Sequence, residues 1–238
     1  MKLAITHLVL STATFGLMLA VPQNAQASGL IRNVTTTQSG FGLASPTTVT
    51  SVITNGFGLQ GPPLNRPSLT GNHALSNVGS TSATNSWRSG AVTVTSGPLS
   101  TMVLEFAFNR IYNLAGFSFW NLGGSSTLAD QGIKTVTIEY KLGSGSWTTL
   151  TGAPTSFAKG TSATTGTISA QVFDFSSPVY ATNVRFRNMS NFGGTATGGN
   201  NRLGLSEIQF TSIPEPSSTL ALLALGLAGM GLGLRKRV

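Results

Sequence analysis

Residues able to carry out catalysis are few in this sequence. The stretch 28–212 holds a single histidine, His73, and no Gly-x-Ser-x-Gly motif, so no pattern pairs a nucleophile with an activating base. A zinc site would need more histidine or acidic ligands near His73 than the sequence provides. Glycoside hydrolysis needs two carboxyl groups that face one sugar. The available acids are Glu105, Asp130, Glu139, Asp174 and Glu207. We therefore expect a protein that is not an enzyme, with a glycoside hydrolase as the alternative.

Aromatic and planar polar side chains in loops suit a different chemistry, the binding of a sugar. Aromatic rings pack against the apolar face of a pyranose, while amide and guanidinium groups bind its hydroxyls. Trp120 stands where a strand pattern meets a glycine loop, and Phe192 lies in the glycine-rich loop 191–201. The candidate ligand-binding residues are Trp120, Asn121, Phe192, Asn191, Arg202, His73 and Arg88. For each of them, packing within its own loop is the alternative role.

The segments that must position these residues have the pattern of β-strands. Apolar and polar residues alternate, and no stretch of 28–212 shows a convincing 3.6-residue period. The cleanest strand, 133–142, precedes a glycine turn and the short strand 146–150, which predicts a hairpin. In 203–210 the apolar phase switches, which predicts a bulge at Ser206-Glu207. The other expected strands are 47–53, 91–95, 101–109, 114–121, 170–175 and 183–188. About nine short strands predict an all-β fold, a single jelly-roll β-sandwich.

The order of these strands resembles the discoidin or coagulation-factor type-C domain family. That family has a galactose-binding-like jelly roll, which many carbohydrate-binding modules also use. The resemblance covers about 72–210. It rests on Trp87-Arg88-Ser89, Met102-Val103-Leu104-Glu105-Phe106, Leu114-Ala115-Gly116-Phe117, Val136-Thr137-Ile138-Glu139-Tyr140, Trp147-Thr148-Thr149-Leu150, Val184-Arg185-Phe186 and Gly204-Leu205-Ser206-Glu207-Ile208.

The resemblance has two implications for single residues. It implies that Trp87 and Trp147 pack in the core. It also implies a structural calcium ion bound by Glu207, with Asn77 or backbone carbonyls completing the site. The family's Asp-Gly turn before the tryptophan is missing, because residues 76–79 read Ser-Asn-Val-Gly. A hydrogen bond between Glu207 and that loop is therefore the alternative, and we expect no other cofactor.

The C-terminal segment 213–238 reads as a membrane-directed signal. After Pro214-Glu215-Pro216 it has an uncharged run, 217–234, and then Arg235-Lys236-Arg237. As a helix the run would be about 27 Å long, close to the ~30 Å hydrocarbon core of a bilayer. The basic tail 235–237 should stay cytoplasmic, so that everything before Pro214 faces away from the cytoplasm.

This arrangement resembles the PEP-CTERM sorting signal of Gram-negative bacteria and cyanobacteria. The resemblance implies recognition and cleavage by an exosortase, an integral membrane enzyme of cells that export extracellular polysaccharide. A plain C-terminal membrane anchor with a proline-rich stem is the alternative. Both interpretations place the body of the protein outside the cytoplasm.

The N-terminus has the pattern of a signal peptide over 1–27. Lys2 precedes the apolar stretch 8–21, and Ala25-Gln26-Ala27 forms a small-x-small cleavage site. The mature chain would begin at Ser28, with a retained N-terminal anchor as the alternative. The remaining residues, 28–212, are enough for one domain with its own core.

Composition excludes some partners. The net charge of +8 includes Lys2, the three basic residues of the C-terminal tail and Glu215. Without them, ten basic and five acidic residues give the body about +5. The basic residues are scattered, which argues against nucleic acid and suits either solubility or an acidic polysaccharide. The chain has no cysteine, so disulfides and thiol chemistry are excluded.

We therefore expect an exported, non-catalytic protein of the cell envelope or extracellular matrix. Its expected role is to bind or organise surface polysaccharide, and its expected partners are an exosortase, the polysaccharide and the membrane. The alternative is a purely structural or adhesive protein without a sugar site.

Overall fold

The computed structural model describes residues 29–40, 50–61, 67–77, 85–91, 98–194 and 201–213. The expected cleavage site at Ala25 and Ala27 lies outside them. So do the sorting signal from Pro214 to Arg237, its helix 217–234 and nearly all of the expected strand 91–95. In the part of the chain that the structure describes, no helix is long and apolar enough to cross a membrane.

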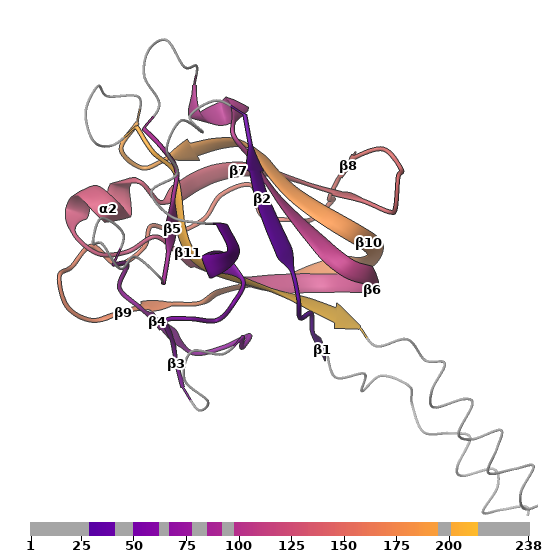
Figure 1. Ribbon diagram of the computed structural model, residues 1–238, viewed down its shortest axis with the longest axis horizontal. Helices are drawn as coiled ribbons and strands as arrows, with labels where there is room; N and C mark the ends of the chain where they lie inside the picture. The colour runs from indigo at the N-terminus through magenta and orange to yellow at the C-terminus, as the bar shows by residue number, and fades with distance from the viewer. Residues whose placement is uncertain are drawn as a thin grey trace, which may run out of the picture.

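β-Strands dominate the described residues (Figure 1). They are β1 (Gly29–Leu30), β2 (Thr35–Ser39), β3 (Leu59–Gln60), β4 (Asn72–Ala74), β5 (Trp87–Arg88), β6 (Val103–Asn121), β7 (Ile133–Lys141), β8 (Thr148–Thr149), β9 (Thr167–Ser169), β10 (Gln171–Asn191) and β11 (Gly204–Ile213). One sheet has the spatial order β1-β11-β6-β10-β7-β8, with β2 also paired to β6 and β5 to β11. A small second sheet has the order β3-β4-β9.

Two strands, β6 and β10, run through both layers of the molecule. β6 has 19 residues and β10 has 21, so each takes the place of two strands expected from the sequence. The first half of β6 pairs with β2 and the second half of β10, while its second half pairs with β11 and the first half of β10. The register of β6 against β10 shifts between Asp174 and Val179 and again between Ala181 and Asn183. One folded sheet therefore forms both faces of an all-β, jelly-roll sandwich (Figure 1).

Phenylalanine rings fill the space between the two faces. Phe106, in the first half of β6, lies 5.3 Å from Phe186 of β10 and 5.2 Å from Phe210 of β11, measured between ring centroids. Phe117, in the second half of β6, lies 5.9 Å from Phe186. All four rings are buried. The alternation that placed Phe106 and Phe117 inward is confirmed, and burial of these rings supplies the main driving force for folding.

The small sheet adds a third layer over the outer face of β6 and β11. Trp120 packs there against Leu59 of β3 and Ile168 just before the end of β9. The Ser118 hydroxyl donates a hydrogen bond to the Leu69 carbonyl at 2.6 Å. This layer buries the outward-facing side chains of Ser118 and Trp120 in β6, which the sequence pattern alone would leave exposed.

Other local expectations have mixed outcomes. The hairpin of β7 and β8 is confirmed, and so is the bulge, because the register of β11 shifts between Leu205 and Glu207. The expected strand 47–53 is wrong where it can be seen: Thr50–Ile53 is a 3-10 helix, η1. Val52 and Ile53 are consecutive and both buried, which a half-exposed strand does not allow. One short helix, α2 (Ser126–Asp130), begins after a capping Ser125.

Candidate functional site

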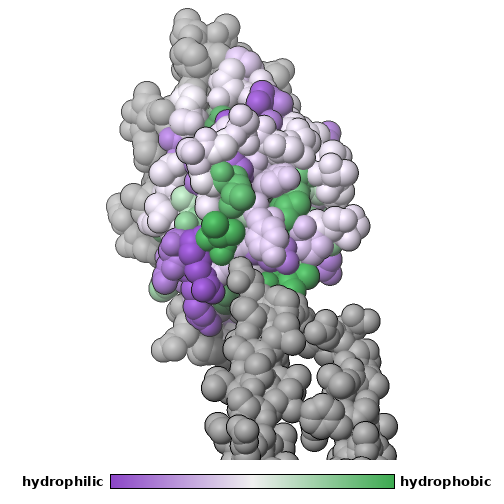
Figure 2. Space-filling model, turned by 90° about the vertical axis from the view of Figure 1, so that its right-hand side faces the viewer, coloured by the Kyte–Doolittle hydropathy of each residue, from purple (hydrophilic) through white to green (hydrophobic). Residues whose placement is uncertain are grey.

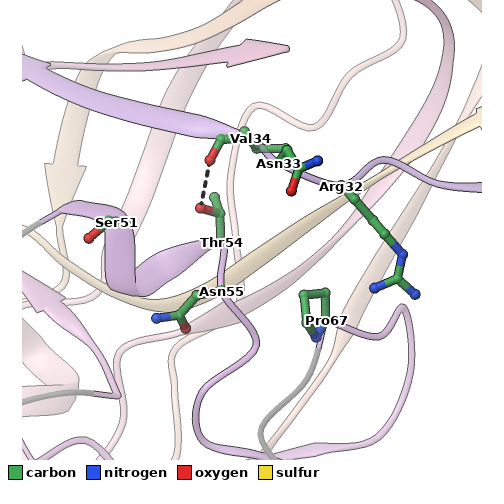
Figure 3. A pocket seen from close by; sticks show the side chains of 7 residues that line it. All are labelled: Arg32, Asn33, Val34, Ser51, Thr54, Asn55 and Pro67. Carbon is green, nitrogen blue, oxygen red and sulfur yellow. Dashed lines mark hydrogen bonds between the residues drawn. The ribbon is translucent and has the colours of Figure 1, made fainter. Parts of the chain in front are cut away.

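A hollow of about 310 Å³ opens between the turn from β1 to β2, helix η1 and Pro67 (Figure 3). Its lining residues are Arg32, Asn33, Val34, Ser51, Thr54, Asn55 and Pro67. None of them was among the ligand-binding candidates drawn from the sequence. Figure 3 shows Arg32 extending toward Pro67 on one side, with Thr54 on the other and Asn33 between them.

The path of the chain explains why polar side chains meet here. β1 pairs with β11 and β2 pairs with the first half of β6, so residues 31–34 carry the chain from one face of the sandwich to the other. Asn33 makes this turn with φ of 59°, a left-handed conformation that asparagine tolerates better than most residues. The Thr54 hydroxyl then donates to the Val34 carbonyl at 3.2 Å, which fixes η1 against the turn.

Several of the lining side chains have unused hydrogen-bonding capacity. Arg32, Asn33 and Ser51 are exposed, and their side chains form no hydrogen bond or ion pair with any described residue. Asn55 is partly used, since its side-chain oxygen accepts from the backbone N–H of Phe57 at 2.8 Å. A guanidinium, an amide and a hydroxyl are the groups that bind sugar hydroxyls and carboxylates. The volume lies at the small end of ligand pockets, about 300–1,000 Å³.

Three of the sequence candidates are buried, which corrects the expectation that they would meet a ligand at the surface. Trp120 is 0% exposed, and its indole N–H donates to the Gly71 carbonyl at 3.0 Å. Asn121 is also 0% exposed and bridges four backbone groups, of which Ile133 supplies two. His73 lies in β4 of the third layer with its side chain buried, and this burial lowers its pKa. A side chain without exposed surface offers no face to a sugar.

The other four candidates lie together near the N-terminal end of β11. They are Arg88, Asn191, Phe192 and Arg202. Arg88 pairs through its backbone with Gly204, next to Arg202. The Asn191 amide donates to the Arg202 carbonyl at 2.9 Å, and Phe192 follows directly. The Asn191 side chain is buried, at 4% exposed, whereas the Phe192 side chain is only half-buried. The structure therefore brings four of the seven candidates together, and their binding role stays a prediction.

The two arginines of this group share one local electrostatic environment. Burial lowers the pKa of both guanidinium groups, and the charge of Arg202 lowers the pKa of Arg88 further. Arg202 donates to the Ser89 carbonyl at 2.8 Å and forms no ion pair with a described residue. Two like charges held together favour a bound anion.

Glu207 occupies the bulge of β11 beneath the third layer, where it is 0% exposed. One carboxylate oxygen accepts hydrogen bonds from the Gly56 backbone N–H at 3.2 Å and from the Gln209 amide. The other oxygen has no hydrogen-bond partner among the described residues. Burial raises the pKa of Glu207 well above its ordinary value, an effect that the two hydrogen bonds only partly oppose.

Asn77, the second residue expected at the calcium site, forms hydrogen bonds with Asn85. The Asn77 side-chain oxygen accepts from the Asn85 backbone N–H at 3.4 Å, and the Asn77 backbone N–H donates to the Asn85 side chain at 3.0 Å. Among the residues whose positions are described, no group of three or more His, Cys, Asp or Glu could hold a metal. A calcium ion would have to rely on Glu207 together with amide and carbonyl oxygens.

Trp147 is not in the core, which corrects the position implied by the family resemblance. It is half-buried and lies over the outer face of the sheet, with Lys141 Nζ 4.5 Å and Arg185 Cζ 4.3 Å from its ring centroid. Arg185 also pairs with Glu139 at 2.5 Å, and Lys141 pairs with Glu105 at 3.3 Å. Both carboxylates are thus occupied by cations, and neither lines the hollow of Figure 3.

Trp147→Ala should lower the free energy of unfolding by about 1–2 kcal/mol, because two partly exposed cation–π contacts of about 0.5–1 kcal/mol each are lost. Urea unfolding followed by far-UV circular dichroism measures the change. Trp147→Phe, which keeps a ring for both cations, should recover part of it. Equal stability of wild type and Trp147→Ala would show that the stacking contributes nothing.

Comparison with known proteins adds a finding on the C-terminus. Residues 212–237 match the family model described as the PEP-CTERM protein-sorting motif. The chain carries a PEP-CTERM sorting motif. The resemblance drawn from Pro214-Glu215-Pro216, the apolar run and the basic tail is thereby confirmed. A search of curated proteins found no match.

Solved structures similar to the chain include three family 32 carbohydrate-binding modules. One is the second such module of a family 31 glycoside hydrolase, bound to GalNAc. Its sequence is 15% identical, the match covers 77% of this chain and 98% of that chain, and the TM-score is 0.47. Another is the NanJ module of Clostridium perfringens with galactose, at 12% identity, 78% and 100% coverage and TM-score 0.41. The third, also from Clostridium perfringens, is in complex with GalNAc-β-1,3-galactose, at 11% identity, 76% and 99% coverage and TM-score 0.45.

Proposed function

We propose that this PEP-CTERM protein is exported and is processed by an exosortase. It binds surface polysaccharide and does not cleave the polysaccharide. The sorting motif at 212–237 supports export and processing. In this proposal the helix 217–234 holds the protein in the membrane until the motif is cut, with the basic tail 235–237 on the cytoplasmic side.

The hollow between the β1–β2 turn and η1 is the observation that carries the binding proposal. It places the Arg32 guanidinium, the Asn33 amide and the Ser51 hydroxyl around a space large enough for one sugar unit. These groups are exposed and unpaired within the described residues, so a ligand need not break internal hydrogen bonds to use them. Arg32 would select glycans that carry carboxylate or another acidic substituent.

Single variants test this site. Asn33→Gly removes the amide but keeps a residue that adopts φ of 59° without strain. Losing one or two hydrogen bonds of about 1 kcal/mol should weaken binding of the host's acidic polysaccharide by roughly 5- to 30-fold. Arg32→Ala should weaken it at least as much at low salt, and less at high salt. Titration calorimetry with the full chain measures both.

Arg110→Ala is the matched control, because it removes an exposed arginine elsewhere on the surface. Its affinity should equal that of the wild type. If Arg202→Ala abolishes binding in a folded protein while Arg32→Ala and Asn33→Gly leave it intact, the sugar site is the cluster of Arg88, Asn191, Phe192 and Arg202. That result would contradict the assignment to the hollow.

A purely structural or adhesive role is the second candidate. It is favoured by large apolar side chains that are exposed on the described surface, among them Ile111, Leu142 and Tyr180. Such side chains on a monomeric surface often mark contact with another molecule.

A further inference from the structure

Exposed apolar side chains gather at the end of the sandwich where β6 and β10 change register. Ile111 of β6 is 50% exposed, Tyr180 of β10 is 51% exposed, and Leu142, just after β7, is 47% exposed. Figure 2 looks at this end of the molecule and shows several hydrophobic side chains grouped among paler ones. Scattered exposed apolar residues are ordinary on a protein surface, so their relative positions matter.

Strand pairing places Ile111 and Tyr180 in one strip beside the C-terminal end of β11. Asn113 of β6 pairs with Tyr180 on one side and with Ile213 on the other. Residues directly opposite each other point to the same face of a sheet, as do residues two apart on one strand. Ile111, Tyr180 and Ile213 therefore share a face, which we call the bend surface. The exposed Arg110 is next to Ile111 in β6 and extends from the other face, beside Tyr112.

The strand segments that form the bend surface contain one basic residue, Arg110, and no acidic one. Arg110 is exposed, and its guanidinium carbon lies 4.8 Å from the ring centroid of Tyr112. The segments 109–114 and 176–182 contain no aspartate or glutamate. The surface is thus apolar and aromatic with a basic edge, as in protein segments that lie at a membrane interface.

The position of Ile213 limits how far this surface can be from a membrane. Only Pro214, Glu215 and Pro216 separate Ile213 from the apolar run 217–234. Four peptide units span at most about 14 Å when fully extended. The headgroup region on each side of a bilayer is roughly 5–8 Å thick. When the run spans the bilayer, Ile213 must therefore lie at or just above the headgroups.

We propose that the bend surface lies directly on membrane lipid while the sorting segment is inserted. This inference rests on the proposed insertion of the helix 217–234. Ile111, Tyr180 and Ile213 enter the boundary between headgroups and acyl chains, and Arg110 binds anionic phospholipid headgroups. The contact fixes the orientation of the sandwich and holds Pro214-Glu215-Pro216 at the bilayer surface, within reach of an integral membrane enzyme.

The absence of cysteine permits a direct test with single labels on the full chain. Ile111→Cys and Tyr180→Cys place an environment-sensitive fluorophore on the bend surface. Thr127→Cys, an exposed position in α2 at the other end of the molecule, is the control (Figure 1). Each protein is reconstituted into vesicles of phosphatidylethanolamine and phosphatidylglycerol with headgroup spin-labelled lipid, and flotation is measured beside fluorescence quenching.

We expect all three proteins to float with the vesicles, and the labels at 111 and 180 to be quenched several-fold more than the label at 127. Flotation with equal quenching at the three positions would overturn lipid contact while leaving the membrane anchor intact. Failure to float would overturn the anchor and the contact together. Replacing phosphatidylglycerol by phosphatidylcholine, or Arg110 by alanine, should reduce quenching at 111, and an unchanged signal would contradict the role of Arg110.

Discussion

Phe117→Ala is expected to lower the free energy of unfolding by about 3–5 kcal/mol, the usual loss when a buried aromatic ring is removed. The Phe117 side chain is 1% exposed. Its ring centroid lies 5.1 Å from that of Phe173, 5.9 Å from those of Phe175 and Phe186, and within 6.2 Å of two more. Since rings from β10 and β11 contact Phe117 of β6, collapse of the cavity would need several strands to move together. With a typical total stability of about 5–15 kcal/mol, the variant should be close to unfolding.

Urea unfolding followed by tryptophan fluorescence measures this loss. Phe57→Ala is the matched control, because it removes the same ring from a side chain that is 42% exposed. Its effect should stay within about 0.5 kcal/mol, as for most surface substitutions. Equal effects of the two variants would contradict the core described here.

Glu207→Gln is expected to remove a pH dependence from the stability of the protein. Burial raises the pKa of Glu207 well above its ordinary value of 4.5, so the folded state keeps a proton that the unfolded chain has released. The contribution of Glu207 to stability is therefore fully present below pH 4.5 and is lost as the pH rises through the raised pKa. The slope in that range is about 1.4 kcal/mol per pH unit. The variant resembles the protonated acid at all pH values and should be more stable than wild type at neutral pH.

The measurement is the difference in free energy of unfolding between wild type and Glu207→Gln from pH 4 to 8, in which contributions of other groups cancel. A constant difference would contradict the raised pKa. The same pair tests the expected calcium ion. If Glu207 binds calcium, excess calcium will stabilise the wild type at neutral pH, by about 2.7 kcal/mol at a hundred times its dissociation constant, and will not stabilise the variant.

The sequence predicts the strands well wherever alternation is strict. In 101–109 and 114–121 every second residue is apolar, and the structure buries Phe106 and Phe117 as that pattern requires. The continuity of β6 through residues 109–113 was not predictable, because Asn109 and Arg110 interrupt the alternation. Pairing with β10 keeps that segment extended, and such pairing is a tertiary effect.

The candidate site was harder to predict, for reasons that differ between residues. Trp120 follows the outward phase of its strand, and only the third layer, β3-β4-β9, buries it. The strands of that layer have two or three residues each, too few for a periodic signal. The hollow joins Arg32 and Asn33 to Ser51 and Thr54, which are polar residues in irregular segments about twenty positions apart. The only local sequence signal for the hollow is an asparagine in a turn, Asn33, and such asparagines are common in many loops.

Binding of polysaccharide without its cleavage can be tested in one experiment. The full chain is titrated with the host's own exopolysaccharide, and the polymer is then recovered for measurement of its length and reducing ends. We expect saturable binding, weakened by Asn33→Gly, and a polymer of unchanged length. The absence of binding by the folded protein would contradict the binding function, and the appearance of new reducing ends would show that the protein is an enzyme.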